Sequence, residues 1–319
     1  MKIDLTNIVD INLPIELNSN TVTGVIGNLN TFLSQEETVT ANLNFSNTNF
    51  AYPGGLTPLL AYLKDKVENN KKYHIILNSK NSPIDSYIRR MGFYKILGLS
   101  DNFSMAKWSG VGRFQEPYYF SKETDANEVT EKSSNIIKTF TTDRNVQNYN
   151  EAIGWCISEI IDNALCHSDA NVSVTMSQKY KNMGITEFCV ADRGIGIKNS
   201  MGIGSIKEAL EKCVTREKGI NSKGRGNGLF YTTELIKRDT SGKCLMTIWS
   251  EDHMLILYSG MELPQVKPVE SYWQGVNISI SMYNGISSSI KDLMKTIDNY
   301  DYSFSYEEQT EYYENLFEN

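Results

Sequence analysis

The sequence predicts an α/β protein made of two parts. Between residues 38 and 100, segments with strand patterns alternate with segments with helix patterns, and the loops between them are short. From residue 171 onward several strand patterns follow one another, which predicts an antiparallel or mixed sheet with helices packed on one side. The segment SKETDANEVTEKSS is polar and charged, which indicates a linker. We therefore expect a small α/β domain over 1–120, a linker over 121–144 and a second domain over 145–284.

The first part has the order strand, helix, strand, helix. TVTANLNF (38–45) alternates as a half-buried strand does, and KYHIILN (72–78) is a short apolar strand. Between them Thr57 and Pro58 suit the cap and the first residue of a helix, PLLAYLKDKVEN. A Ser-Pro pair at 82–83 opens the next helix in the same way.

The second part combines three helices with several strands. Helix patterns cover about 145–167, 204–213 and 228–238. Strand patterns cover 171–178, 185–192, 244–250, 253–259 and 276–282. The segment IWSEDHML predicts a hairpin turn between the third and fourth of these strands.

Composition excludes several classes of function. The 319 residues carry a formal net charge of −7, which argues against a nucleic-acid or anionic-membrane binder. The first residues lack the apolar core of a signal peptide, and no apolar run approaches membrane-spanning length. The five cysteines form no C-x-x-C pair, and three histidines are too few for a histidine-rich metal site. We expect a soluble, cytoplasmic protein without a nucleic-acid or membrane partner.

One predicted helix carries two functional groups on a single face. In SEIIDNALCHS, Glu159 and Asn163 are four residues apart, so their side chains lie on one face, one turn apart. A carboxylate and an amide placed in this way are, in isolation, best explained as a solvated surface. A function for the pair requires partners elsewhere in the chain.

Two glycine clusters supply such partners. FCVADRGIGI is a buried strand that ends at Asp192 and is followed by Gly194 and Gly196, where the backbone can approach a flat ligand closely. In SKGRGNGLFYTTELIK, three glycines precede a helix, whose positive end can hold an anion. These three are Gly224, Gly226 and Gly228. The spacings match neither a P-loop nor the dinucleotide-binding G-x-G-x-x-G motif.

The ordered set E-x-x-x-N, D-x-G-x-G and G-x-G-x-G-L resembles the GHKL ATPase and kinase superfamily. The resemblance covers about residues 145–283 and implies a two-layer α/β Bergerat sandwich with ATP and Mg²⁺ as cofactors. It implies a general-base role for Glu159, a Mg²⁺ ligand at Asn163 and an adenine contact at Asp192. The implied nucleotide-binding residues are Asn163, Asp192, Gly194, Gly196, Gly224, Gly226, Gly228 and Leu229, under a mobile lid over 198–223.

The N-terminal part narrows the choice within that superfamily. LNFSNTNFAYPGGLTPLLAYL resembles a STAS-like domain, of the kind that partners anti-sigma-factor kinases. Such domains usually carry D-S-S-G-L at this loop, and here Tyr52, Pro53 and Gly54 stand before Gly-Leu, so the acceptor serine is absent. The final strand also departs from the superfamily, because Val276 takes the place of the usual Thr.

The resemblances together imply an ATP-binding regulatory protein. It would hydrolyse ATP or transfer the γ-phosphate to a Ser or Thr of a protein partner, and a homodimer is a further candidate arrangement. The alternative is a non-catalytic binding module that uses ATP as a conformational ligand. Residues 285–319 are acidic and rich in tyrosine, and we expect them to form a helical tail.

Overall fold

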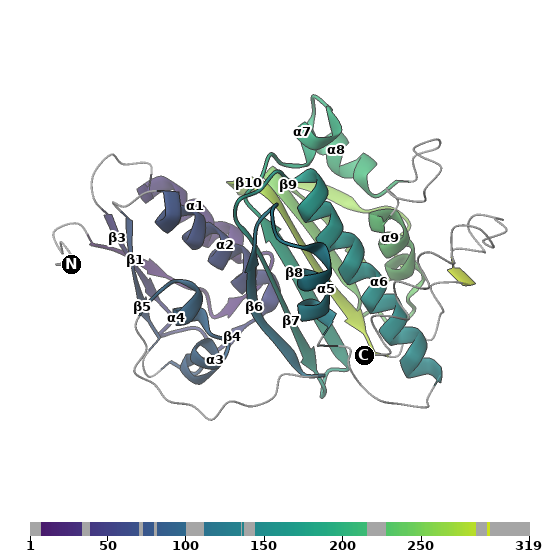
Figure 1. The fold of residues 1–319 in the computed structure, drawn as a ribbon, viewed down its shortest axis with the longest axis horizontal. Coiled ribbons are helices and arrows are strands. Elements are labelled where there is room, and N and C mark those ends of the chain that lie inside the picture. The colour runs from purple at the N-terminus through teal and green to yellow at the C-terminus, as the bar shows by residue number, and fades with distance from the viewer. Residues whose placement is uncertain are drawn as a thin grey trace.

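The computed structural model of the chain describes residues 8–33, 39–69, 73–79, 82–99, 112–134, 136, 144–215, 228–284 and 292–293. It confirms a mixed α/β architecture, in which an N-terminal parallel sheet with helices is followed by a five-stranded antiparallel sheet packed against helices (Figure 1). Most of the expected acidic tail lies outside the described residues. None of the helices in the described ranges combines the length and the apolar composition needed to cross a bilayer.

The N-terminal unit is built on a three-stranded sheet in the order β1-β3-β5, and all its strand pairs are parallel. Its three strands are β1 (Ile8–Asn12), β3 (Val39–Asn44) and β5 (Tyr73–Asn78). A separate pair is formed by β2 (Glu16–Leu17) and β4 (Phe50–Ala51). The helices are α1 (Val22–Leu33), α2 (Pro53–Asn69), α3 (Asp85–Arg90) and α4 (Phe93–Ile96).

The second sheet has the strand order β6-β7-β8-β10-β9, with antiparallel pairs throughout. Its strands are β6 (Phe114–Phe120), β7 (Ser173–Tyr180), β8 (Ile185–Asp192), β9 (Leu245–Tyr258) and β10 (Gln265–Tyr283). The helices of this part are α5 (Ala126–Ser134), α6 (Arg144–His167), α7 (Ile197–Met201), α8 (Ile206–Cys213) and α9 (Gly228–Arg238). The predictions for α6, α8, α9 and β8 are confirmed to within two residues.

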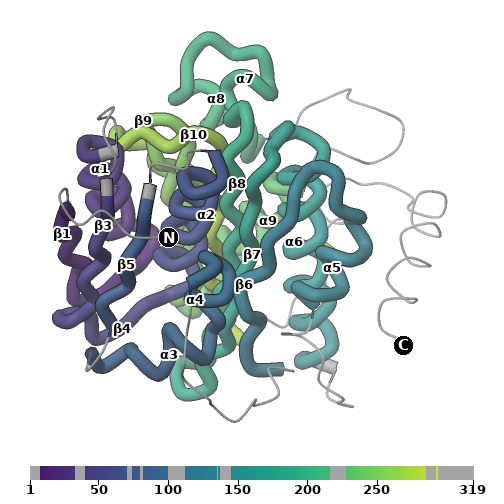
Figure 2. The backbone as a smooth tube through the Cα atoms, turned by 60° about the vertical axis from the view of Figure 1, so that its left-hand side comes forward, coloured from purple at the N-terminus to yellow at the C-terminus, as the bar shows by residue number. Residues whose placement is uncertain are grey.

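Helices cover both faces of the five-stranded sheet (Figures 1 and 2). On one face α5, α6, α8 and α9 enclose an apolar core with strand residues such as Val190 and Ile278. On the other face α1 and α2 lie between this sheet and the three-stranded sheet, and Trp249 and Trp273 are fully buried there. The N-terminal unit therefore adds two layers, its helices and its three-stranded sheet, to the expected sheet with helices on one side (Figure 1).

The segment expected to be a linker is part of the second half of the fold. Strand β6 lies just before this segment and pairs with β7, and within the segment α5 packs on α6 through the fully buried Val129. The polar composition of 121–134 was misleading because α5 needs only one narrow face against its neighbours, and three of its four buried residues are Thr or Ser. Residues 137–143 lie outside the described part of the chain.

The prediction of a hairpin turn at IWSEDHML is wrong. Strand β9 runs through this segment without a turn and pairs with a β10 strand that begins at Gln265. The Asp and Glu that suggested a turn accommodate an irregularity instead: Glu251 has a positive φ of 51°, and its carbonyl accepts a hydrogen bond of 3.0 Å from Trp249 Nε1. A local change of register at this point therefore replaces a turn.

Helix α2 begins at Pro53 rather than near Thr57, which is fully buried inside the helix. The cap comes from a distant strand, because the Gly54 N–H donates a 2.8 Å hydrogen bond to Glu187 Oε1 of β8. A Cβ on Gly55 would lie 2.6 Å from the carbonyl of Leu17, so glycine is required for this close approach. The expected N-cap is thus replaced by a tertiary contact.

Glu187 is a buried carboxyl group between the two parts of the molecule. It is 5% exposed, and Ser279 Oγ lies 3.3 Å from the oxygen that accepts from Gly54. Burial raises the pKa of Glu187 to about 7, and the two hydrogen bonds oppose this shift. Burial, and to a smaller extent the charge of Glu187, raises the pKa values of Tyr87 and Tyr180.

We predict that Glu187→Gln increases stability above neutral pH. The folded protein holds a proton on Glu187 between pH 4.5 and about 7 that the unfolded chain releases, so this group's contribution to stability decreases as pH rises through that range. The glutamine keeps an acceptor for Gly54 but cannot ionise. Urea unfolding measures the free energy of unfolding of both proteins at pH 5 and at pH 8. The difference, variant minus wild type, should be roughly 2–3 kcal/mol larger at pH 8 than at pH 5. The control Glu68→Gln, on the same interface helix, should show no such gain.

Candidate functional site

The two polar residues of α6 lie beside the start of α9. Glu159 and Asn163 are half-buried, while the opposite face of α6 fills the core with Ile157 and Ile161. A Cβ added to Gly228 would collide with the carboxylate and the Cβ of Glu159. The first and the third sequence motifs are therefore in direct contact.

Asp192 ends β8 with a buried side chain that is 3% exposed. Its Oδ1 accepts hydrogen bonds from the N–H groups of Gly194 (2.9 Å) and Val276 (3.2 Å). Burial raises the pKa of Asp192 to about 7, although both hydrogen bonds and the nearby Arg193 favour the charged form. A carboxylate has about four lone-pair sites, so this group keeps acceptor capacity for a ligand N–H.

The loop after Asp192 packs against the end of α6. The Ile195 N–H donates a 2.7 Å hydrogen bond to the carbonyl of Ser168, and a Cβ on Gly194 would collide with that carbonyl. Gly196 has a φ of +80°, which favours glycine. The second motif therefore contacts the helix that carries the first.

A residue pair that the sequence did not identify completes the surroundings of Asp192. Gly275 of β10 has a φ of +104°, and a Cβ there would collide with the Asp192 carbonyl. The Ser250 hydroxyl donates to the Gly275 carbonyl at 2.6 Å and accepts from the Ile197 N–H at 3.4 Å. A glycine directly before an apolar strand was the only available signal, and nothing in the sequence marked Ser250.

The described part of the predicted lid is already folded onto the core. Ile206, Ala209 and Leu210 of α8 are buried, and the Ser205 hydroxyl caps the helix. Lys198 of α7 forms an ion pair of 2.8 Å with Glu251 of β9. These contacts hold the described part of the expected lid, residues 198–215, against the core.

The remaining predicted residues fall into two groups. Leu229 is 9% exposed and belongs to the core beneath α9. Gly224 and Gly226 lie outside the described residues. In the described ranges no three His, Cys, Asp or Glu side chains are grouped as a metal site. A Mg²⁺ ion shared with phosphates and water needs only one or two protein oxygen ligands, and the half-buried amide of Asn163 carries one such oxygen.

Comparison with protein-family models and with curated protein sequences gives no significant match. The arrangement of the described residues is therefore the basis for a functional proposal. Its main feature is that three separate stretches of sequence meet around the second half of α6.

We predict that Gly194→Ala destabilises the protein, because the added methyl group collides with the backbone carbonyl of Ser168. The expected loss is roughly 1–3 kcal/mol, the usual cost of overpacking. Gly204→Ala is a matched control ten residues along the chain, since a Cβ there meets nothing within 4 Å. Urea unfolding of the two variants measures the difference. Equal stability would mean that the loop after β8 is free to move away from α6.

Proposed function

We propose that this protein binds Mg²⁺–ATP where α6, the loop after β8 and the start of α9 meet, and that it hydrolyses ATP or transfers the γ-phosphate to a protein Ser or Thr. One observation carries the proposal. The Glu159 side chain fills the space beside Gly228, and Gly194 lies against Ser168 at the end of the same helix. These contacts support one site built from the described parts of the three GHKL-like motifs, in which Glu159 and Gly228 lie side by side although 69 positions separate them in the sequence.

Asp192 is the proposed adenine-binding residue. Its carboxylate is buried and accepts hydrogen bonds from two backbone N–H groups, beside glycines that let the backbone approach closely. A fixed, desolvated carboxylate is suited to accept a hydrogen bond from the adenine amino group. A nucleoside without that amino group would leave the buried Asp192 carboxylate without a donor, which costs binding free energy. Asp192 would therefore select for adenine.

The opposite end of the site would handle the phosphates. Asn163 would offer its amide oxygen to Mg²⁺, which supplies charge neutralisation for the phosphates when it is bound. The N–H groups at the start of α9, an eleven-residue helix, favour anions. Glu159 lies against that helix start and would accept the proton of the attacking water or hydroxyl group.

The phosphoryl acceptor belongs to another protein in this proposal. The loop of the STAS-like segment has no serine before Gly55-Leu56, and the neighbouring Gly54 N–H is used to bind Glu187. A non-catalytic module that uses ATP as a conformational ligand is the second candidate. It is supported by the contact of the N-terminal helices with the same sheet that carries Asp192.

The first test is nucleotide binding by calorimetry in the presence of Mg²⁺. We predict that Asp192→Ala weakens ATP binding by roughly 1–3 kcal/mol, because the adenine amino group loses its acceptor. Asp252→Ala is the control, since that carboxylate is exposed and pairs with His253. Equal affinity of wild type and Asp192→Ala would refute the adenine site.

The second test separates the enzyme from the binding module. We predict that Glu159→Ala still binds ATP but turns over roughly 10²–10⁴-fold more slowly, because the general base is lost. Asp162→Asn, an exposed carboxylate on the same helix, should retain full turnover. Release of labelled phosphate and labelling of protein from γ-labelled ATP are the measurements. If wild type forms neither ADP nor phosphoprotein with any partner, the binding module is the correct alternative.

A further inference from the structure

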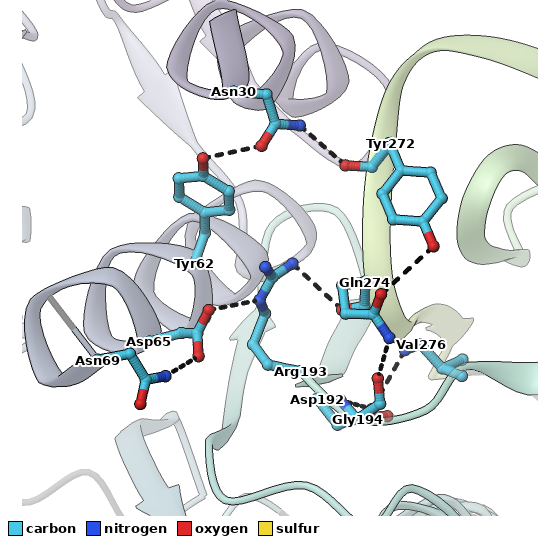
Figure 3. Close-up of polar contacts among 10 residues, drawn as sticks. All are labelled: Asn30, Tyr62, Asp65, Asn69, Asp192, Arg193, Gly194, Tyr272, Gln274 and Val276. Carbon is cyan, nitrogen blue, oxygen red and sulfur yellow. Dashed lines mark hydrogen bonds and ion pairs between the residues drawn. The ribbon is translucent and has the colours of Figure 1, made fainter. Parts of the chain in front are cut away.

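Arg193 follows Asp192 directly, but its side chain extends to the N-terminal helices (Figure 3). Its Nε lies 3.2 Å from Asp65 Oδ2 of α2, and these side chains are only 8% and 19% exposed. The guanidinium carbon lies 5.1 Å from the ring centre of Tyr62 and 4.8 Å from that of Trp273. Nη1 donates a 3.2 Å hydrogen bond to the carbonyl of Gln274. A buried, hydrogen-bonded ion pair of this kind has a well-defined geometry.

A second set of hydrogen bonds joins α1 and α2 to the loop after β8, which contains Gly194 (Figure 3). The Tyr62 hydroxyl donates to Asn30 Oδ1 (2.8 Å), and Asn30 Nδ2 donates to the Tyr272 carbonyl (3.0 Å). Tyr272 then donates its hydroxyl to Gln274 Oε1 (3.3 Å). Finally, Gln274 Nε2 donates to the carbonyl of Gly194 (2.6 Å).

Both sets end at the groups that hold Asp192. The Gly194 N–H is one of the two donors to Asp192 Oδ1, and the Val276 N–H is the other. Gln274 lies two residues before Val276 and binds Gly194 through its side chain. Moving α1 or α2 would therefore shift both donors, and with them the carboxylate.

We infer that the N-terminal helices position the Asp192 carboxylate for adenine, and that Asp65 and Gln274 are positioning residues of the nucleotide site. This inference rests on the function proposed above. It makes the N-terminal unit a positive regulator of nucleotide selectivity: when α1 and α2 are in contact with the sheet, the two N–H donors are fixed. A purely structural role would instead hold the layers together without affecting which nucleotide binds.

The test compares Asp65→Asn with Glu68→Gln, the same chemical change three residues along α2 on a carboxylate that pairs with Lys64. Calorimetry with ATP and with purine riboside triphosphate, which lacks the 6-amino group, measures the selectivity. Asp65→Asn should weaken ATP binding roughly 5- to 10-fold, within the usual range of coupling between sites, and leave the other nucleotide unchanged. Glu68→Gln should change neither affinity. Equal loss for both nucleotides, or no loss, overturns the inference.

Hydrogen exchange of the nucleotide-free protein separates this inference from the proposed function. Residues 193–197 should exchange faster in Asp65→Asn than in wild type or in Glu68→Gln. Gln274→Met, which removes the bonds to Gly194 and Tyr272, should behave like Asp65→Asn and replaces it if that variant does not fold. If wild type binds neither nucleotide, the proposed function fails, and faster exchange still supports positioning of the loop. Unchanged exchange in both variants overturns the inference that Asp65 and Gln274 position this loop.

Discussion

The candidate site depends on three places where a glycine leaves room for another part of the chain. Gly194 admits the carbonyl of Ser168, Gly228 admits the carboxylate of Glu159, and Gly275 admits the backbone of Asp192. Any side chain at these positions would force β8, α6, α9 or β10 apart. The convergence of the polar groups is therefore a steric consequence of glycine placement, and the electrostatics of the site follow from it, because the close approach is what buries Asp192.

The two faces of the five-stranded sheet differ in chemistry. Toward α6 the central strands present apolar residues such as Phe188, Val190 and Ile280. Toward the N-terminal helices they also present the buried polar side chains of Glu187, Asn277 and Ser279. Polar groups in such a layer need partners with fixed geometry, and Glu187 finds one in the first turn of α2. The interface between the five-stranded sheet and the N-terminal helices is thus specified by hydrogen bonds as well as by apolar packing.

Local patterns predicted the elements whose determinants are local. The boundaries of β8 and α9 follow from a run of apolar residues and a glycine before a helix, and both match the structure. The start of α2 could not be predicted, because its cap is a carboxylate 133 residues away in the chain. The turn expected near Glu251 was wrong because the same residue types also suit a register change. Within the site, Asp192 was marked by adjacent glycines, whereas Gln274 acts through contacts that no spacing rule reveals.

The bond between Asn30 and Tyr272 spans 242 residues of sequence and has a kinetic consequence. Helix α1 packs on β10, so it cannot complete its packing until β10 has been synthesised and paired. Part of its apolar surface therefore stays uncovered during most of translation. Contacts of such large separation are formed late, since a long loop must be closed before they contribute. The order of assembly is thereby constrained: the three-stranded sheet can collapse early, while the layer between the two sheets closes last.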